Sequence, residues 1–143
     1  MTIKVRAEEM ATFLEEVFPQ VRGMFAIDRL DEELLVMRLI ASDQHLRPGG
    51  TVSGPAMFSL VDVAAYVATM SRIGKEALAV TTNCSIDFMR KPVAGVDVVA
   101  HAKLLKLGKS LSVTDVLLFS EGKPDPVARA TLTYSLPPIP QTF

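Results

Sequence analysis

Asp62 is the one charged residue between Gly54 and Met70, a segment whose other side chains are mostly apolar. A carboxylate in an apolar helix loses hydration, which is unfavourable unless a hydrogen-bond partner or a function compensates. It lies about two turns beyond the expected helix start, too deep to cap that helix. It could act as a general base or nucleophile. A carboxylate that is merely satisfied by Ser59 or by a neighbouring chain stays open as the alternative.

The start of the same segment could bind a polarised oxygen. Ser53 or Gly54 can cap the helix, and Pro55 suits its first turn because the missing N–H would have no partner there. The unpaired backbone N–H of Gly54, helped by the helix dipole, could stabilise an oxyanion. A glycine that only begins a helix is the alternative.

The histidines and the cysteine give little support for metal or thiol chemistry. His45 and His101 are separated by most of the chain and lack a third ligand at metal-site spacing. Cys84 lies on the apolar face of a predicted strand, which favours a core role. A single cysteine also excludes an intramolecular disulfide and a multi-cysteine zinc site. We therefore expect no metal.

The whole composition favours one domain, residues 1–143, with a single substantial core. Apolar residues make up 49% of the chain and the net charge is −1, so nucleic acid and anionic membranes are not expected partners. The N-terminus lacks the apolar region of a secretory signal. Asp62 and Arg72 interrupt the best candidate for a membrane span. These features predict a cytoplasmic protein.

The elements that would position Asp62 follow from hydrophobic periodicity. Residues 7–18 predict an amphipathic helix that ends before Pro19, and residues 23–40 predict a β-hairpin. Residues 54–73 predict a long helix that ends at Gly74. That helix is apolar around most of its circumference, so other structure should wrap around it.

The rest of the chain changes to a period of two. From Val80 to Met89 one face is expected to be apolar, with Val80, Thr82 and Cys84 on it, and the other polar. Residues 78–136 predict four strands whose short connectors favour antiparallel neighbours, followed by an irregular tail over 137–143. The fold class is therefore α+β, an antiparallel sheet wrapped around a long central helix.

The order of elements and three short motifs resemble the hotdog-fold acyl-CoA thioesterases of the phenylacetate-pathway (PaaI-like) type. The main motif is Gly50-Thr-Val-Ser-Gly-Pro-Ala-Met-Phe-Ser-Leu-Val-Asp62. Its counterpart in the family reads Gly-Thr-x-His-Gly-Gly, with an acid about eight residues after the first glycine of His-Gly-Gly. The other two are Ile86-Asp-Phe-Met-Arg-Lys-Pro92, similar to a strand ending in Phe-Leu-Arg-Pro, and Leu107-Gly-Lys-Ser110, similar to a Gly-Lys/Arg turn.

The resemblance implies hydrolysis of an acyl-CoA thioester to a carboxylic acid and free coenzyme A. Asp62 would be the general base or nucleophile, and the Gly54 N–H of another subunit would polarise the carbonyl. Thr81 matches a position where some relatives place a hydroxyl that orients the water. A homodimer, and a dimer of dimers, is implied. No cofactor is implied, because coenzyme A is part of the substrate.

Further residues are implied to contact the substrate, and particularly the coenzyme A moiety. They are Ser53, Pro55, Ser59, Arg90, Lys91, Lys106, Gly108 and Lys109. The cations among them could instead be solvated charges at strand ends, and Ser59 could bond only to its own helix backbone. Met57 and Phe58 are expected in the core, where they could also meet an acyl chain.

Departures from the family pattern motivate a second hypothesis. Ser53 replaces the usual His, Pro55 replaces the second Gly, and Arg47 stands near where some relatives carry an Asn that helps to hold the carbonyl. A non-catalytic acyl-CoA-binding module is therefore the alternative function. A hotdog dehydratase or hydratase is less well supported, because no paired His and acid lies near the central helix.

Overall fold

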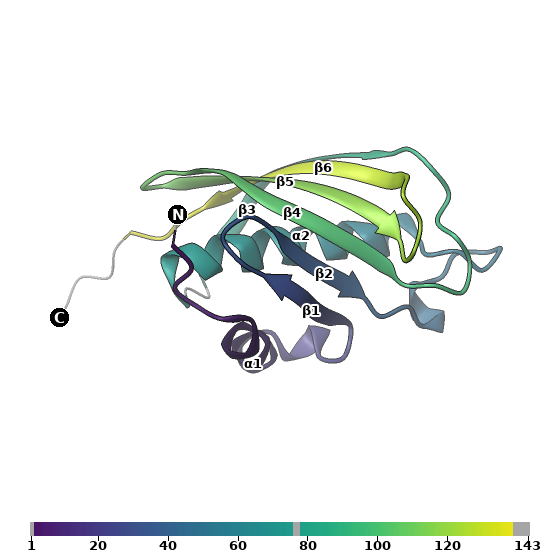
Figure 1. Cartoon of the computed structure of the whole chain (residues 1–143), viewed down its shortest axis with the longest axis horizontal. Coiled ribbons are helices and arrows are strands. Elements are labelled where there is room, and N and C mark those ends of the chain that lie inside the picture. The colour runs from purple at the N-terminus through teal and green to yellow at the C-terminus, as the bar shows by residue number, and fades with distance from the viewer. Residues whose placement is uncertain (1, 76–77, 139–143) are drawn as a thin grey trace.

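A six-stranded sheet curls around one long helix, α2 (Gly54–Ile73), and a shorter helix, α1 (Ala7–Val17), lies below α2 in the view of Figure 1. The computed structural model describes residues 2–75 and 78–138, so the expected tail is described only for residues 137–138, which are irregular. All strand pairs are antiparallel. The predicted α+β class, with an antiparallel sheet wrapped around a long helix, is confirmed.

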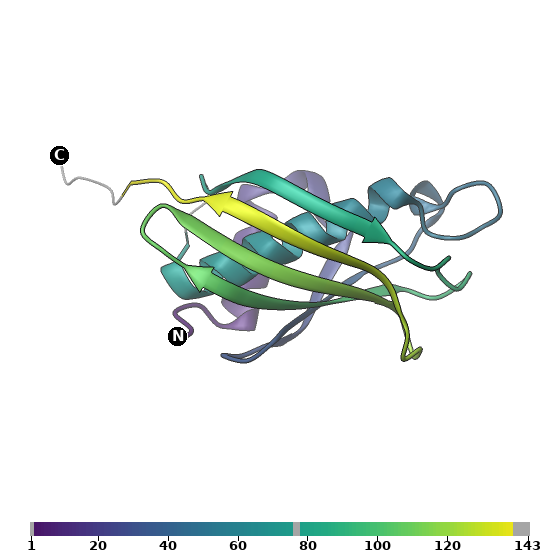
Figure 2. The same cartoon turned by 90° about the horizontal axis from the view of Figure 1, so that it is seen from above.

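The sheet runs in the order β1-β2-β4-β5-β6-β3, so β1 and β3 are its edges. Its strands are β1 (Phe25–Leu30), β2 (Leu35–Leu39), β3 (Val80–Phe88), β4 (Val98–Leu107), β5 (Leu111–Ser120) and β6 (Pro126–Ser135). Two short 3₁₀ helices, η1 (Pro19–Val21) and η2 (Asp43–His45), lie in the connections. Figure 2 shows β4, β5, β6 and β3 crossing over α2.

Local signals account for the limits of α2. Ser53 is the N-cap, and its Oγ accepts a hydrogen bond from the backbone N–H of Ala56 at 3.3 Å. Pro55 occupies the first turn, where no N–H is needed. The helix ends at Gly74, whose φ of 99° is a left-handed value that glycine adopts without strain.

The apolar surface of α2 is covered by protein. By length and composition alone, α2 could cross a membrane, so the expectation that Asp62 and Arg72 would prevent this was wrong. However, 78% of its most apolar 18-residue window is buried inside the chain. Leu60, Ala64 and Val67 are fully buried, and the inner sides of the strands pack around them. α2 is therefore the core helix of the fold.

Strand β3 departs from the strict alternation expected from the sequence. Its register with β6 shifts between Thr81 and Asn83, where a β-bulge places one extra residue in β3. Thr81 is consequently half-buried, whereas Val80 and Thr82 are exposed. The prediction that Val80 and Thr82 belong to the apolar face was wrong, because the bulge inverts the alternation at this point.

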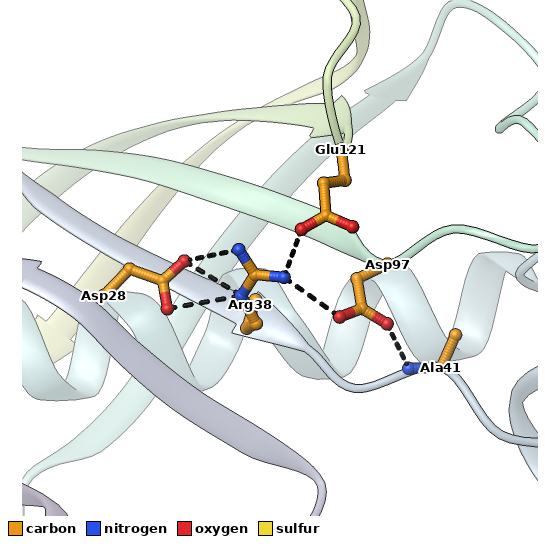
Figure 3. A network of polar contacts seen from close by, with 5 residues as sticks. All are labelled: Asp28, Arg38, Ala41, Asp97 and Glu121. Atoms are coloured by element: carbon orange, nitrogen blue, oxygen red, sulfur yellow. Dashed lines mark hydrogen bonds and ion pairs between the residues drawn. The ribbon is translucent and has the colours of Figure 1, made fainter.

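One arginine ties several strands together at one end of the sheet (Figure 3). The guanidinium of Arg38 on β2 binds the carboxylates of Asp28, Asp97 and Glu121. These hydrogen bonds hold the pKa of Arg38 above its usual value. The other oxygen of Asp97 accepts the backbone N–H of Ala41 at 2.9 Å, at the start of the loop that leads to Ser53. The network thus anchors that loop to the sheet.

Candidate active site

Asp62 is held by two hydroxyl groups from the sheet. The Oγ1 of Thr81 donates to its Oδ1 at 2.5 Å, and the hydroxyl of Tyr134 lies 2.9 Å from the same oxygen. The Tyr134 hydroxyl also lies 2.9 Å from the carbonyl oxygen of Asp62. Both side-chain bonds therefore go to Oδ1. Within residues 2–75 and 78–138, Oδ2 receives no hydrogen bond, so one oxygen of the carboxylate is fixed and the other is available.

A lone charge in an apolar helix suggested that Asp62 would be fully buried, but the structure shows it half-buried. The two hydroxyl donors offset the hydration that it loses. Ser59 does not contribute, because its Oγ donates to the carbonyl of Pro55 at 3.0 Å. The alternative in which Ser59 satisfies Asp62 was thus wrong, and its bond to its own helix backbone is confirmed.

The bulge in β3 explains why Thr81 and Tyr134 reach the same carboxylate. The two residues are direct partners across the β3–β6 ladder, and Tyr134 is on the inner side of β6 with Ala130 and Leu132. In a regular strand, Thr81 would lie three positions from Cys84, on the opposite side of the strand, and would point away from α2. The bulge at Thr82 turns it inward. The local irregularity therefore aims the Thr81 hydroxyl at Asp62.

Tyr134 was not predicted as a site residue. Its side chain is only 3% exposed, and burial, with the nearby charge of Asp62, holds its pKa well above the usual value. The phenol therefore remains a hydrogen-bond donor at all physiological pH values. A sequence signal exists, because a tyrosine on the apolar face of a strand needs a partner for its hydroxyl. That signal does not identify Asp62 as the partner.

A pocket of about 410 Å³ opens beside Asp62. Its walls come from the C-terminal end of α1, the start of β3, α2 and β6. Its lining residues are Val17, Phe18, Asp62, Val63, Tyr66, Ala79, Val80, Thr81 and Tyr134. The rings of Tyr66 and Tyr134 lie 6.0 Å apart, tilted by 42°. Asp62 thus lines a space that is large enough for a small ligand and has both polar and apolar walls.

Gly54 lies at a different place on the same helix. Within the described ranges 2–75 and 78–138, its backbone N–H has no acceptor, so it could bind an oxyanion. Eight residues separate it from Asp62, a rise of about 12 Å along the axis. One chain therefore cannot direct both groups at one carbonyl. A Cβ added to Gly54 would lie 3.5 Å from the ring of Phe88, which covers the helix start.

The candidate cations do not gather within one chain. Arg90 and Lys91 follow the end of β3, whereas Lys106, Gly108 and Lys109 lie at the β4–β5 turn. Figure 2 shows these two places at opposite ends of the sheet. All four cationic side chains are exposed, and Arg90 donates to the carbonyl of Pro126 at 2.8 Å. Their roles stay predictions.

The remaining candidates lie outside the chemistry around Asp62. His45 is buried, with Nδ1 accepting the backbone N–H of Ser42 at 3.2 Å, and His101 packs against the ring of Phe119. Cys84 is half-buried near Asp62, and burial together with that negative charge raises the pKa of its thiol. Across residues 2–75 and 78–138, no group of three or more His, Cys, Asp or Glu residues could hold a metal ion.

Comparisons with known proteins identify the family and agree with the fold. The sequence pattern of the thioesterase superfamily matches residues 49–127. A protein from Silicibacter sp. TM1040, provisionally assigned as a thioesterase, is 55% identical, with 96% of each chain covered and a TM-score of 0.91. The PaaI protein of the phenylacetic acid degradation operon of E. coli is 26% identical, covering 91% of this chain and 92% of that one, with a TM-score of 0.77.

More distant structures share the fold. Zebra fish thioesterase superfamily member 2 is 21% identical, covering 94% of this chain and all of that one, with a TM-score of 0.82. The chain matches none of the curated proteins.

Proposed function

This chain belongs to the thioesterase superfamily and has the hotdog fold, and we propose that it hydrolyses acyl-CoA thioesters to a carboxylic acid and free coenzyme A. One observation carries the proposal. Thr81 and Tyr134 hold one oxygen of the Asp62 carboxylate and leave the other without a hydrogen-bond donor among the described residues, and Asp62 lines a pocket with both polar and apolar walls. A fixed base beside a space for an acyl group is what thioester hydrolysis requires.

The available oxygen of Asp62 would take a proton from water while the water oxygen bonds to the thioester carbon. Thr81 donates its hydrogen to Asp62, so its oxygen can accept a hydrogen bond from that water. The tetrahedral intermediate then breaks its C–S bond. Protonated Asp62 returns the proton to the sulfur of coenzyme A, which completes the balance. Direct attack by Asp62 through an anhydride is the second route, and only that route would place ¹⁸O from labelled water in the protein.

A second subunit would complete the site. The Gly54 N–H of that subunit would donate a hydrogen bond to the thioester oxygen and so stabilise the negative charge that develops there. The separation of Gly54 and Asp62 along α2 supports this arrangement, as does the position of β3 at an edge of the sheet. Two β3 edges that pair antiparallel bring the Gly54 end of one subunit to the Asp62 end of the other.

The same pairing would unite the separated cations. Lys106 and Lys109 lie at the end of the sheet where β3 starts, whereas Arg90 and Lys91 lie at the other end. In an antiparallel dimer, cations of both chains thus lie at the same end of each site, outside the residues that line the pocket beside Asp62, which suits the phosphates of coenzyme A. Ser53, Pro55, Ser59 and Gly108 would complete the surface that contacts the substrate.

The alternative function is acyl-CoA binding without hydrolysis. This alternative is favoured by the start of α2, which would have to bind the thioester carbonyl. There the Oγ of Ser53 caps the helix, and Pro55 has no N–H to donate. Only the Gly54 N–H is then left for the carbonyl. The two functions differ in one outcome, the release of free thiol.

A thiol-release assay over short, long and aromatic acyl-CoAs tests the proposal. We expect thiol release with at least one member of the panel, first order in enzyme. Calorimetry with the same acyl-CoAs measures their binding and so tests the alternative function. Saturable binding of the whole panel, with no thiol above the uncatalysed rate, would establish the binding module instead.

A further inference from the structure

Two exposed apolar side chains at the end of α1 face the same pocket as Asp62. Val17 is 40% exposed and Phe18 is 38% exposed, and both line the pocket. The helix that carries them is otherwise acidic on its solvent side, with Glu15 and Glu16 immediately before. Large apolar groups that stay exposed beside a reactive carboxylate indicate contact with a ligand.

Phe18 is held in place by the way in which α1 ends. Met10 and Leu14 are buried and fix the helix to the core. The backbone N–H of Phe18 donates to the carbonyl of Leu14 at 2.9 Å, and its carbonyl accepts the N–H of Val21 at 3.1 Å. Pro19 prevents the helix from continuing. The backbone of Phe18 is thus fixed at a position where its aromatic side chain lines the pocket.

The charges around the pocket restrict what can enter it. Asp62 is the one charged side chain among the described residues that line the pocket, so the pocket walls supply no cation. An acyl group that ends in a second carboxylate would lose hydration inside the pocket and meet a like charge, with no cation among the lining residues to offset it. An alkyl or aryl group would instead contact Phe18, Val63 and Val80.

We propose that Val17 and Phe18 form a wall of the acyl pocket, and that the enzyme selects uncharged, apolar acyl groups against acyl groups that end in a carboxylate. This inference rests on the proposed thioester hydrolysis and extends it to the class of substrate.

Hexanoyl-CoA and adipoyl-CoA test the selection, because they have equal carbon numbers and differ in the terminal carboxylate. The wild type should show a kcat/KM for hexanoyl-CoA at least about tenfold higher. Val17→Lys places a cation at an exposed position of the wall. It should lower the hexanoyl to adipoyl ratio of kcat/KM by about three- to tenfold.

A matched control and a second variant keep the test decisive. Ile40→Lys adds the same charge at an apolar position that is 41% exposed and does not line the pocket, so its ratio should equal that of the wild type. Phe18→Ala should lower kcat/KM for hexanoyl-CoA relative to acetyl-CoA by about tenfold.

Each outcome separates the two claims. Thiol release with ratios that neither Val17→Lys nor Phe18→Ala changes would overturn the inference and leave thioester hydrolysis intact. A Phe18→Ala variant that alters the oligomeric state in size-exclusion chromatography, with unchanged ratios, would assign Phe18 to a subunit contact and also overturn it. If the wild type releases no thiol from any acyl-CoA, the proposed function fails, and the inference fails with it.

Discussion

Tyr134→Phe removes one of the two hydroxyls that fix Asp62 and leaves the ring in place. The lost group lies 2.9 Å from Oδ1 and 2.9 Å from the carbonyl of Asp62. A hydrogen bond to a charged group contributes about 1.5–3 kcal/mol, and the half-exposed position of Asp62 favours the lower end. If the misoriented Asp62 stabilises the transition state by about 1.4 kcal/mol less, kcat falls about tenfold.

The assay is steady-state thiol release from the best acyl-CoA. Thr131→Val is the matched control, because it removes a hydroxyl from an exposed position of the same strand. It should retain the wild-type kcat. A Tyr134→Phe enzyme with wild-type kcat would refute the claim that Tyr134 positions the base.

Three further predictions concern stability. Ser53→Ala removes the N-cap of α2 and should lower the free energy of unfolding in urea by about 1 kcal/mol. Arg38→Gln leaves three neighbouring carboxylates without their cation and should cost about 1 kcal/mol, a value reduced by solvent screening. Burial raises the pKa of Tyr134 in the folded state above the usual 10.0, so the stabilisation is present below that pH and is lost as pH rises beyond it. The urea midpoint of the wild type should thus fall more steeply above pH 10 than that of Tyr134→Phe.

The parts of the fold that local signals specify could be predicted from the sequence. Ser53, Pro55 and Gly74 are cap and turn residues whose effects do not depend on distant contacts, and α2 begins and ends beside them. The lone charge of Asp62 in an apolar segment directed attention to the right helix. The fold class followed from these patterns, and the family resemblance is confirmed.

The geometry around Asp62 could not be predicted in the same way. The inward aim of Thr81 depends on a bulge, and strict alternation placed Thr81 on the polar side. Tyr134 meets Asp62 because β6 lies beside β3, a register between segments more than 50 residues apart. The contribution of Phe18 depends on where α1 docks. Each of these contacts is long-range, and no local motif encodes it.

The most direct test of the central claim is kcat for thiol release by Asp62→Asn. Asparagine keeps the size of the side chain and can still accept the hydroxyl bonds of Thr81 and Tyr134, but it cannot take a proton from water. We predict that kcat falls by about 10²- to 10⁴-fold, while acyl-CoA affinity and the unfolding midpoint stay close to those of the wild type. An Asp62→Asn enzyme with wild-type kcat on the best substrate would contradict the account.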